Sequence, residues 1–442
     1  MTTTAPAPHR ARVVDTLLVG AQVALPSIAT GLVQRREPVM GIADRLRLDR
    51  HAIRRMQRLR ARHGTGLLRL RVPGRPVALV MSPEDVGRVL ADAPEPFSPA
   101  SMEKRAALAH FQPHGVLISR ETRAERRRFN ESVLDTHRPV HRLADSIAAV
   151  VSDEAARLNS AADAAGQLSW QDFGTHWWRI VRRVVLGEHA ADDELLTTQL
   201  ETLRRRGNWA YLAPRAERTR KRFAERLGEH LDRAEPGSVA GLVANEPAGP
   251  DTDRYGQVPH WLFAFDAAGM VTYRALALLA AHPEQARTAR DEARGDGSGV
   301  PQHLPFLRAS VLDSTRLWPT TPVLLRETTT ETEWQGRTLP SGTTVLIYTP
   351  FFHRDERTLS YANRFAPDIW LDGTSRENPA LVPFSDGPAR CPGENLVLLV
   401  ASMLLGHLLT TRDYRPLDEH RLDPNRPMPA TLDAFGLRFA PA

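Results

Sequence analysis

The stretch Phe384-Ser-Asp-Gly-Pro-Ala-Arg-Cys-Pro-Gly393 contains the only cysteine of the 442-residue chain. Two prolines and two glycines in ten residues cannot continue a helix or a central strand, so they predict a sharply folded loop. Residues Glu394 to Leu409 are apolar nearly all round and predict a buried helix. Cys391 therefore lies just before a helix N-terminus, where backbone N–H groups favour the thiolate form that binds a metal.

A lone cysteine is most often a small buried apolar residue. A packing cysteine needs no glycine on either side, whereas a thiolate that a flat macrocycle approaches needs nearby backbone without a Cβ atom. The loop has glycine at two such places, Gly387 and Gly393. The sequence therefore favours a metal-ligand role for Cys391 over simple packing.

The loop resembles the haem-ligand loop of the cytochromes P450, whose pattern is F-x-x-G-x-R-x-C-x-G. The residues that match this spacing are Phe384, Gly387, Cys391 and Gly393. The family's propionate-binding position two before the cysteine is Ala389 here, and Arg390 follows it. The resemblance implies that Cys391 is the axial ligand of a haem iron, that Phe384 shields the thiolate and that Arg390 contacts a propionate.

The composition limits the classes of partner. The chain carries 58 Lys and Arg against 52 Asp and Glu, a net charge of +6, and its only lysines are Lys104 and Lys221. The arginine clusters are spread along the chain without the interleaved aromatic residues of a strand-binding groove, so no nucleic-acid partner is expected. A single cysteine excludes an internal disulfide and fits a reducing compartment, which predicts a cytoplasmic protein.

Arginines are prominent on a predicted helix from Arg120 to Leu134, where Arg123 and Arg127 lie one turn apart on one face. A solvated charged face is the simpler interpretation. In the resembled family, the equivalent helix carries Trp or His, then three residues, then Arg, and the pair holds a haem propionate. The resemblance implies this role for Arg127, leaves it open for Arg123, and implies a further propionate contact for Arg326 after the strand that begins at Val323.

The longest apolar helix is predicted from Trp261 to about His282, and its even hydrophobicity predicts a central position. Its segment Ala268-Gly269-Met270-Val271-Thr272 resembles the family's A-G-x-[Asp/Glu]-Thr, where the chain makes room for dioxygen and the hydroxyl delivers protons. The resemblance implies these catalytic roles for Ala268, Gly269 and Thr272, with Val271 in place of the acid. The alternative is that the Thr272 hydroxyl bonds the Ala268 carbonyl, as is common in buried helices.

A further pair is predicted on the helix from Pro305 to Trp318. Asp313 and Arg316 lie three residues apart on one face and can form a charge-assisted pair. They are similar to the family's Glu-x-x-Arg, with a shorter acid. The arginine that completes this network in the family would fall at Ile369, and the sequence leaves open whether Arg354 or Arg364 replaces it.

The N-terminal residues 1–44 are predicted to be a segment separate from the main domain, residues 45–442. Thr16 to Val33 carries no charge and is flanked by arginines on both sides. It can be a packing segment, a membrane-contacting segment, or a signal-like segment with Ser27-Ile28-Ala29 as its cleavage site. Ala93 to His114 is expected to be mostly loop because it contains four prolines, and the aromatic turn from Gly207 to Pro214 corresponds to the family's substrate lid.

The resemblance spans about Arg45 to Leu437 and implies a mainly α fold with a small β lobe, in a single large domain that binds haem b. It implies a bacterial haem-thiolate monooxygenase that inserts one oxygen atom from O2 into a small or medium-sized organic substrate. Electrons would come from a ferredoxin and a ferredoxin reductase.

The altered family positions keep other functions open: Val271, Asp313, Ile369 and Ala389. One is a haem-thiolate enzyme that uses peroxide, or that couples or rearranges its substrates. The other is a non-enzymatic haem-binding protein. A hydrolase with a cysteine nucleophile is the alternative without haem. It would need a nearby base, and His407 lies sixteen residues further along the next helix.

Overall fold

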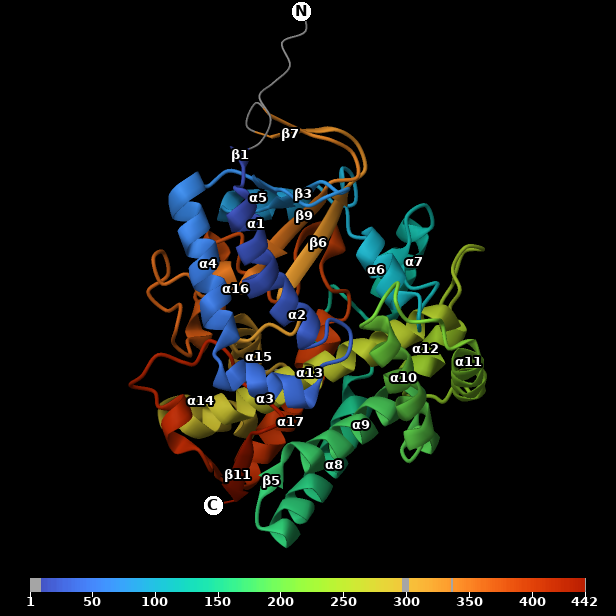
Figure 1. Ribbon diagram of the computed structural model, residues 1–442. Helices are drawn as coiled ribbons and strands as arrows, with labels where there is room; N and C mark the ends of the chain where they lie inside the picture. The colour runs from blue at the N-terminus through green and yellow to red at the C-terminus, as the bar shows by residue number, and fades with distance from the viewer. Residues whose placement is uncertain (1–8, 296–301, 335–336, 442) are drawn as a thin grey trace, which may run out of the picture.

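The computed structural model describes residues 9–295, 302–334 and 337–441. Helices dominate the chain, as predicted (Figure 1). They are α1 (Val13–Val19), α2 (Leu25–Ala29), α3 (Glu37–Arg45), α4 (Leu48–His63), α5 (Pro83–Ala91), α6 (Met102–Leu108), α7 (Arg123–Val133), α8 (Ala144–Ala165), α9 (Trp170–Leu186), α10 (Glu194–Gly207), α11 (Glu217–Asp232), α12 (Val239–Asn245), α13 (Val258–Ala281), α14 (Pro283–Arg294), α15 (Pro305–Leu317), α16 (Thr349–His353) and α17 (Glu394–Thr411).

Short strands form the smaller part of the fold. They are β1 (His9–Arg10), β2 (Leu68–Leu70), β3 (Val77–Leu79), β4 (Phe97–Ser98), β5 (Leu168–Ser169), β6 (Val323–Thr328), β7 (Thr332–Trp334), β8 (Arg337–Leu339), β9 (Thr344–Tyr348), β10 (Tyr414–Pro416) and β11 (Arg438–Pro441). The largest sheet has the order β1-β2-β3-β9-β6-β4, and two smaller sheets have the orders β10-β11-β5 and β7-β8. The turn expected between β7 and β8 lies outside the described residues.

The central helix is α13, which is apolar on all sides and packs against α9, α14, α15 and α17 (Figure 1). Two helices, Tyr255–Ala281 and Glu394–Thr411, are long and apolar enough to cross a membrane by length and composition. In each, 78% of the most apolar window is buried inside the protein. Both are therefore explained as core helices, and the prediction of a mainly α fold with a small β lobe is confirmed.

Two proline- and glycine-containing stretches contain short helices, and the first of them is the one expected to be mostly loop. The proline-broken stretch between residues 93 and 114 contains β4 and α6, and the stretch between residues 234 and 258 contains α12. Each helix begins at a serine whose hydroxyl accepts a backbone hydrogen bond, Ser101 from the Lys104 N–H and Ser238 from the Gly241 N–H. These serine caps stabilise the first turn of both helices against the proline- and glycine-rich surroundings.

The N-terminal residues pack on the sheet lobe. β1 pairs in parallel with β2, with His9 opposite Leu68. A π-helical turn, Gly20–Ala24, joins α1 to α2, so that Val13–Ala29 forms one nearly continuous helix beside α4 (Figure 1). Residues 9–45 are thus attached to the main domain by a strand and by helix packing.

Candidate functional site around Cys391

The cysteine loop folds as a tight turn ahead of α17. The Cys391 N–H donates to the Phe384 carbonyl at 2.9 Å. Gly387 has a φ of +65°, and a Cβ atom there would lie 2.1 Å from the Leu90 carbonyl oxygen, so only glycine fits between the loop and α5. At Gly393 a Cβ atom would make only an ordinary contact of 3.7 Å with a leucine. Packing therefore explains Gly387, whereas Gly393 leaves room beside Cys391 for a further group.

The protonation of Cys391 depends on what the sulfur contacts. Burial raises the pKa of the thiol to about 11. The Gly393 N–H and the charges of Arg127 and Arg390 act in the opposite direction without compensating. The backbone N–H at the start of α17 lowers the pKa of the thiol, in the direction expected from the sequence, but desolvation is the larger effect. A thiolate here needs a cation in contact with the sulfur, which a bound metal supplies.

Three basic side chains from α6, α7 and β6 lie near one another inside the protein, and we call them the cation cluster: Lys104, Arg123 and Arg326. Arg123 is 6% exposed and Arg326 is 2% exposed. Each of the three donates to a neutral oxygen: Lys104 and Arg123 to backbone carbonyls at 3.1 and 3.0 Å, and Arg326 to the Ser385 hydroxyl at 3.1 Å. Because Ser385 belongs to the cysteine loop, the cation cluster and Cys391 form one site.

The cation cluster contains more positive charge than its surroundings neutralise. Burial, followed by repulsion from neighbouring arginines, lowers the pKa of Arg123 and of Arg326 to about 10 each. Burial also lowers the pKa of Lys104 well below its ordinary value, and the charges of both arginines lower it further. The Nε atom of Arg326 is buried without a hydrogen-bond partner among the described residues. An anionic ligand would supply the missing acceptors and the missing charge.

The other two predicted propionate contacts lie at the loop itself. Arg127 pairs with Glu131 at 2.5 Å and donates to the Arg390 carbonyl at 2.6 Å. The Arg390 guanidinium donates to Glu394 at 2.6 and 2.8 Å, and its side chain is 54% exposed. The structure therefore brings Arg123 and Arg326 together, places Arg127 against the cysteine loop, and directs Arg390 toward α17 and solvent.

Asp313 and Arg316 form the predicted pair on α15, and neither side chain is exposed. Two hydrogen bonds of 2.5 and 3.1 Å join them. Asp313 also accepts from the Ala366 N–H at 2.8 Å and from the Trp370 indole N–H at 3.2 Å. The remaining N–H groups of Arg316 donate to three backbone carbonyls, those of His353, Ala362 and Arg364. The pair is thus satisfied entirely by its own chain.

The place expected for a second arginine at Ile369 is filled by its neighbour. The Trp370 indole donates to Asp313 directly. Arg354 donates to backbone carbonyls elsewhere, and Arg364 contributes a backbone carbonyl to the pair. Neither the Arg354 nor the Arg364 side chain therefore takes the place of the family's arginine. The neutral indole N–H of Trp370 binds Asp313 there instead.

Comparison with known proteins agrees with this geometry. The family model of cytochrome P450 matches residues 264–432. Cyclooctat-9-en-7-ol 5-monooxygenase of Streptomyces melanosporofaciens is 33% identical over 148 residues, which are 32% of each chain. Probable cytochrome P450 4s3 of Drosophila melanogaster is 27% identical over 176 residues, or 39% of this chain and 36% of the relative. These matches span about a third of the relatives' length.

A solved structure extends the similarity to most of the chain. Retinoic acid bound cyanobacterial CYP120A1 superposes with a TM-score of 0.71 and 18% identity, over 87% of this chain and 93% of that one. The family match covers residues 264–432, and the superposition shows that most of the chain has the fold of a cytochrome P450.

The residues around Cys391 fit a haem group. Within residues 9–295, 302–334 and 337–441, no group of three or more His, Cys, Asp or Glu side chains could hold a metal ion. A metal bound at Cys391 must therefore bring most of its own ligands, as porphyrin iron does. The two carboxylates of such a macrocycle match the unsatisfied cation cluster, and Gly393 leaves space at the sulfur.

The central helix has one half-buried face, which we call the open stripe: His260, Phe263, Ala264 and Ala267. Their spacing of three and four residues places them on one side of α13. Burial, then the charge of Lys104, lowers the pKa of His260 to about 4. Its Nδ1 atom is buried without a partner in the part of the chain that the structure describes. The open stripe therefore lies on the side of α13 that is nearer the cation cluster.

The catalytic segment expected from the family lies largely elsewhere on the helix. Thr272 has no exposed surface, and its hydroxyl donates to the Ala268 carbonyl at 2.8 Å. A Cβ atom at Gly269 would lie 2.8 Å from the Trp177 indole nitrogen. Packing against α9 therefore explains Gly269, and back-bonding, the alternative interpretation, explains Thr272. Proton delivery by Thr272 stays a prediction, because a hydroxyl bonded in this way can still accept a hydrogen bond.

Asp266 also points away from the open stripe. It forms an ion pair with Arg204 of α10 at 2.5 Å, and the same guanidinium nitrogen donates to the Val33 carbonyl at 3.2 Å. The carboxylate thus ties the central helix to α10 and to the N-terminal segment. As expected from its position on the helix, Asp266 does not replace the missing acid beside Thr272.

Proposed function

We propose that this chain is a haem-thiolate monooxygenase that inserts one oxygen atom of O2 into a small or medium-sized organic substrate. The observation that supports this most directly is the cysteine loop bonded, through Ser385, to a buried and unneutralised cation cluster. A hydrolase with a cysteine nucleophile would need a base beside the thiol rather than arginines. The P450 relatives named as monooxygenases support the same reaction class.

The residues have separate roles in this proposal. Cys391 binds the iron, and the cation cluster holds the propionates while Arg127 braces the cysteine loop. Phe384, whose carbonyl accepts from the Cys391 N–H, packs beside the sulfur. Haem b is the form proposed, because a single cysteine used as the axial ligand leaves none for covalent attachment. Thiolate-ligated haem supplies the oxidising power for attack on unactivated C–H bonds.

We further propose that electrons come from a ferredoxin and its reductase. The net charge of +6 favours an acidic protein as the docking partner. The single cysteine fits a cytoplasmic location. The N-terminal segment, Val13–Ala29, is apolar and short, which favours peripheral contact with a membrane over crossing it.

The spectrum of the reduced, carbon-monoxide-bound protein tests this function. Wild-type protein is expected to show the red-shifted Soret band of thiolate ligation, and Cys391→Ser is expected to lose it while circular dichroism keeps the same helix content. Arg390→Gln, whose side chain pairs with Glu394, serves as a control that keeps the band. A protein that takes up no porphyrin, or a wild-type Soret band without the red shift, contradicts the proposal.

A peroxide-using enzyme is the second candidate, and the central helix favours it. Neither a hydroxyl nor a carboxylate lies on the open stripe, where Ala264 and Ala267 are half-buried. An enzyme that takes its oxygen atom from peroxide depends less on proton delivery to bound dioxygen. Substrate oxidation with peroxide alone, at a rate equal to or above that with the electron-transfer proteins, would select this candidate. Failure of both systems across a broad screen would indicate a non-enzymatic haem-binding protein.

A further inference from the structure

The N-terminal helix exposes its apolar side. Leu17 and Leu25 are 67% and 61% exposed on α1 and α2. Further apolar side chains on the same outer side are also exposed: Val13, Val14, Ile28 and Leu32. A helix on a water-exposed surface normally carries polar side chains on its outer side.

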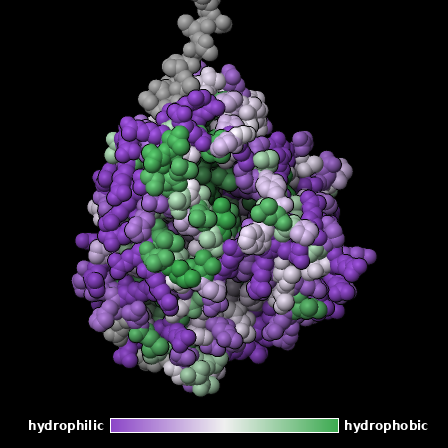
Figure 2. Space-filling model, viewed as in Figure 1, coloured by the Kyte–Doolittle hydropathy of each residue, from purple (hydrophilic) through white to green (hydrophobic). Residues whose placement is uncertain are grey.

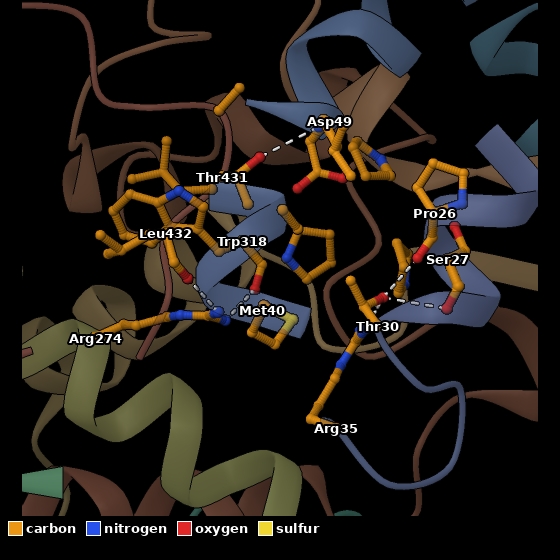
Figure 3. A pocket seen from close by; sticks show the side chains of 17 residues that line it. Pro26, Ser27, Thr30, Arg35, Met40, Asp49, Arg274, Trp318, Thr431 and Leu432 are labelled. Atoms are coloured by element: carbon orange, nitrogen blue, oxygen red, sulfur yellow. Dashed lines mark hydrogen bonds between the residues drawn. The ribbon is translucent and has the colours of Figure 1, made fainter. Parts of the chain in front are cut away.

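The inner side of the same helix buries Val19 and Val23 in the core and also carries well-bonded polar groups. Asp15 has no exposed surface, accepts from Arg62 at 2.8 Å and contacts the His63 ring at 3.1 Å. Figure 3 shows Ser27 and Thr30 directed into a small cavity. Polar contacts on the inner side therefore fix the rotation of the helix, and this rotation directs the leucines outward.

A second apolar segment adjoins the helix. The turn after α10 exposes Trp209 by 54%, Tyr211 by 62% and Leu212 by 82%. Asn208 at the start of this turn accepts from the N–H groups of residues 33 and 34 at 2.8 and 3.1 Å and donates to the carbonyl of residue 34 at 2.7 Å. These bonds fasten the turn to the chain that follows α2. Figure 2 shows apolar side chains gathered over α1 and α2, with hydrophilic surface around them.

We call these residues together the outer apolar surface: Val13, Val14, Leu17, Leu25, Ile28, Leu32, Trp209, Tyr211 and Leu212. The neighbouring helix α4 exposes Arg50, Arg54 and Arg58. Arg12 is exposed at the start of α1, and the Arg36 guanidinium lies 4.9 Å from the centre of the Trp209 ring. An apolar face bordered by arginines matches the two layers of an anionic membrane surface, which are acyl chains and phosphates.

We propose that the outer apolar surface docks on an anionic lipid bilayer, with the N-terminal helix lying in the plane of the interface. Val13–Ala29 is a short apolar helix that extends about 25 Å, and its inner side is fixed to the protein, so it suits an interfacial position better than a crossing one. Anionic lipid and the outer apolar surface are thus the two partners in the peripheral membrane contact proposed above. Lipid binding needs no turnover, so the inference stands or falls separately from the monooxygenase activity.

Sedimentation of the haem-loaded full chain with vesicles tests the proposal. Vesicles of phosphatidylcholine with about 30% phosphatidylglycerol are compared with pure phosphatidylcholine, and the anionic vesicles are expected to bind more protein. The double variant Leu17→Glu and Leu25→Glu is expected to lower the partition coefficient by at least about tenfold. Leu212→Glu tests the turn, with an expected loss of about threefold. Raising the salt concentration is expected to weaken binding without abolishing it.

The matched control places two glutamates at leucines exposed elsewhere, Leu195 and Leu417, which are 51% and 56% exposed. Leu195→Glu with Leu417→Glu is expected to bind vesicles within about twofold of wild type. Equal binding by the Leu17 and Leu25 double variant, or no binding to anionic vesicles, overturns the proposal. A concentration-dependent dimer that the same double variant abolishes also overturns the proposal. In that case a second copy of the chain, and not a membrane, would cover the outer apolar surface. The carbon monoxide spectrum of each variant reports haem ligation independently.

Discussion

Two buried ionic regions of the protein differ in how their charge is balanced. The Asp313–Arg316 pair has one acid for one base, and backbone and indole groups complete its hydrogen bonds. The cation cluster has three bases that donate to neutral oxygens, and the Nε atom of Arg326 is left without a partner among the described residues.

The first region is neutralised by the chain itself, whereas the second has positive charge that the chain does not neutralise. A buried charge costs free energy unless an opposite charge or several hydrogen bonds compensate it. The chain compensates Asp313 and Arg316 itself, so this pair contributes to the folded state with or without haem. Under the proposed function, the cation cluster is compensated only when an anion such as a haem propionate binds. Substitutions in the two regions should therefore act on different states of the protein.

The largest expected effect comes from breaking the balanced pair. Asp313→Ala leaves the Arg316 guanidinium buried without its counter-charge, which should lower the free energy of unfolding by about 3–5 kcal/mol. Denaturant unfolding of the haem-free protein measures this loss. Asp313→Glu keeps the charge and serves as the control, with a loss of less than about 2 kcal/mol. If Asp313→Ala unfolds at the same denaturant concentration as wild type, the pair is not structural.

A smaller effect, of opposite sign in the two states, is expected in the cation cluster. Arg326→Met removes a buried cation of similar volume, so the haem-free protein should be as stable as wild type or about 1 kcal/mol more stable. The haem-loaded protein loses a charge-assisted hydrogen bond to a propionate, so haem affinity should fall about tenfold to a hundredfold. Haem transfer to a competing protein measures the affinity, and denaturant unfolding measures the stability.

Arg308 supplies the matched control for Arg326. It is similarly buried, at 6% exposure, but its guanidinium donates to the Pro139 carbonyl and to the Asn395 side chain, and the charges of Glu394 and Glu292 partly offset its own. Arg308→Met should therefore lower the stability of the haem-free protein and leave haem affinity within about threefold of wild type. Equal loss of haem affinity in both variants would show that the cation cluster has no particular role in haem binding.

The cysteine loop and the balanced pair could be predicted because their signals are local in the sequence. Proline and glycine fix the loop within ten residues, and a spacing of three places Asp313 beside Arg316 on any helix. The replacement of the expected arginine by Trp370 could not be predicted. It depends on how residues 366–370 fold against α15, over more than fifty positions in the chain.

Lys104 and His260 were missed for a different reason. Lys104 lies in a stretch whose prolines predict a loop, although the Ser101 cap was a readable sign of a helix. His260 begins a repeat of three and four residues that continues through Phe263 and Ala267, but an evenly apolar helix gives no indication of which face is open. Only the packing of Trp177 against Gly269 fixes the rotation of α13.

The smallest expected effect tests that rotation. Thr272→Val removes a hydroxyl that is bonded to the Ala268 carbonyl, so it should change the free energy of unfolding by less than about 1 kcal/mol and turnover by less than about twofold. Ala267→Val adds volume to the open stripe and should lower turnover at least about tenfold. Product formed per electron consumed is the measurement. A large loss in Thr272→Val with none in Ala267→Val would place the reacting face on the Thr272 side of α13, because a residue that only packs cannot change how electrons are used.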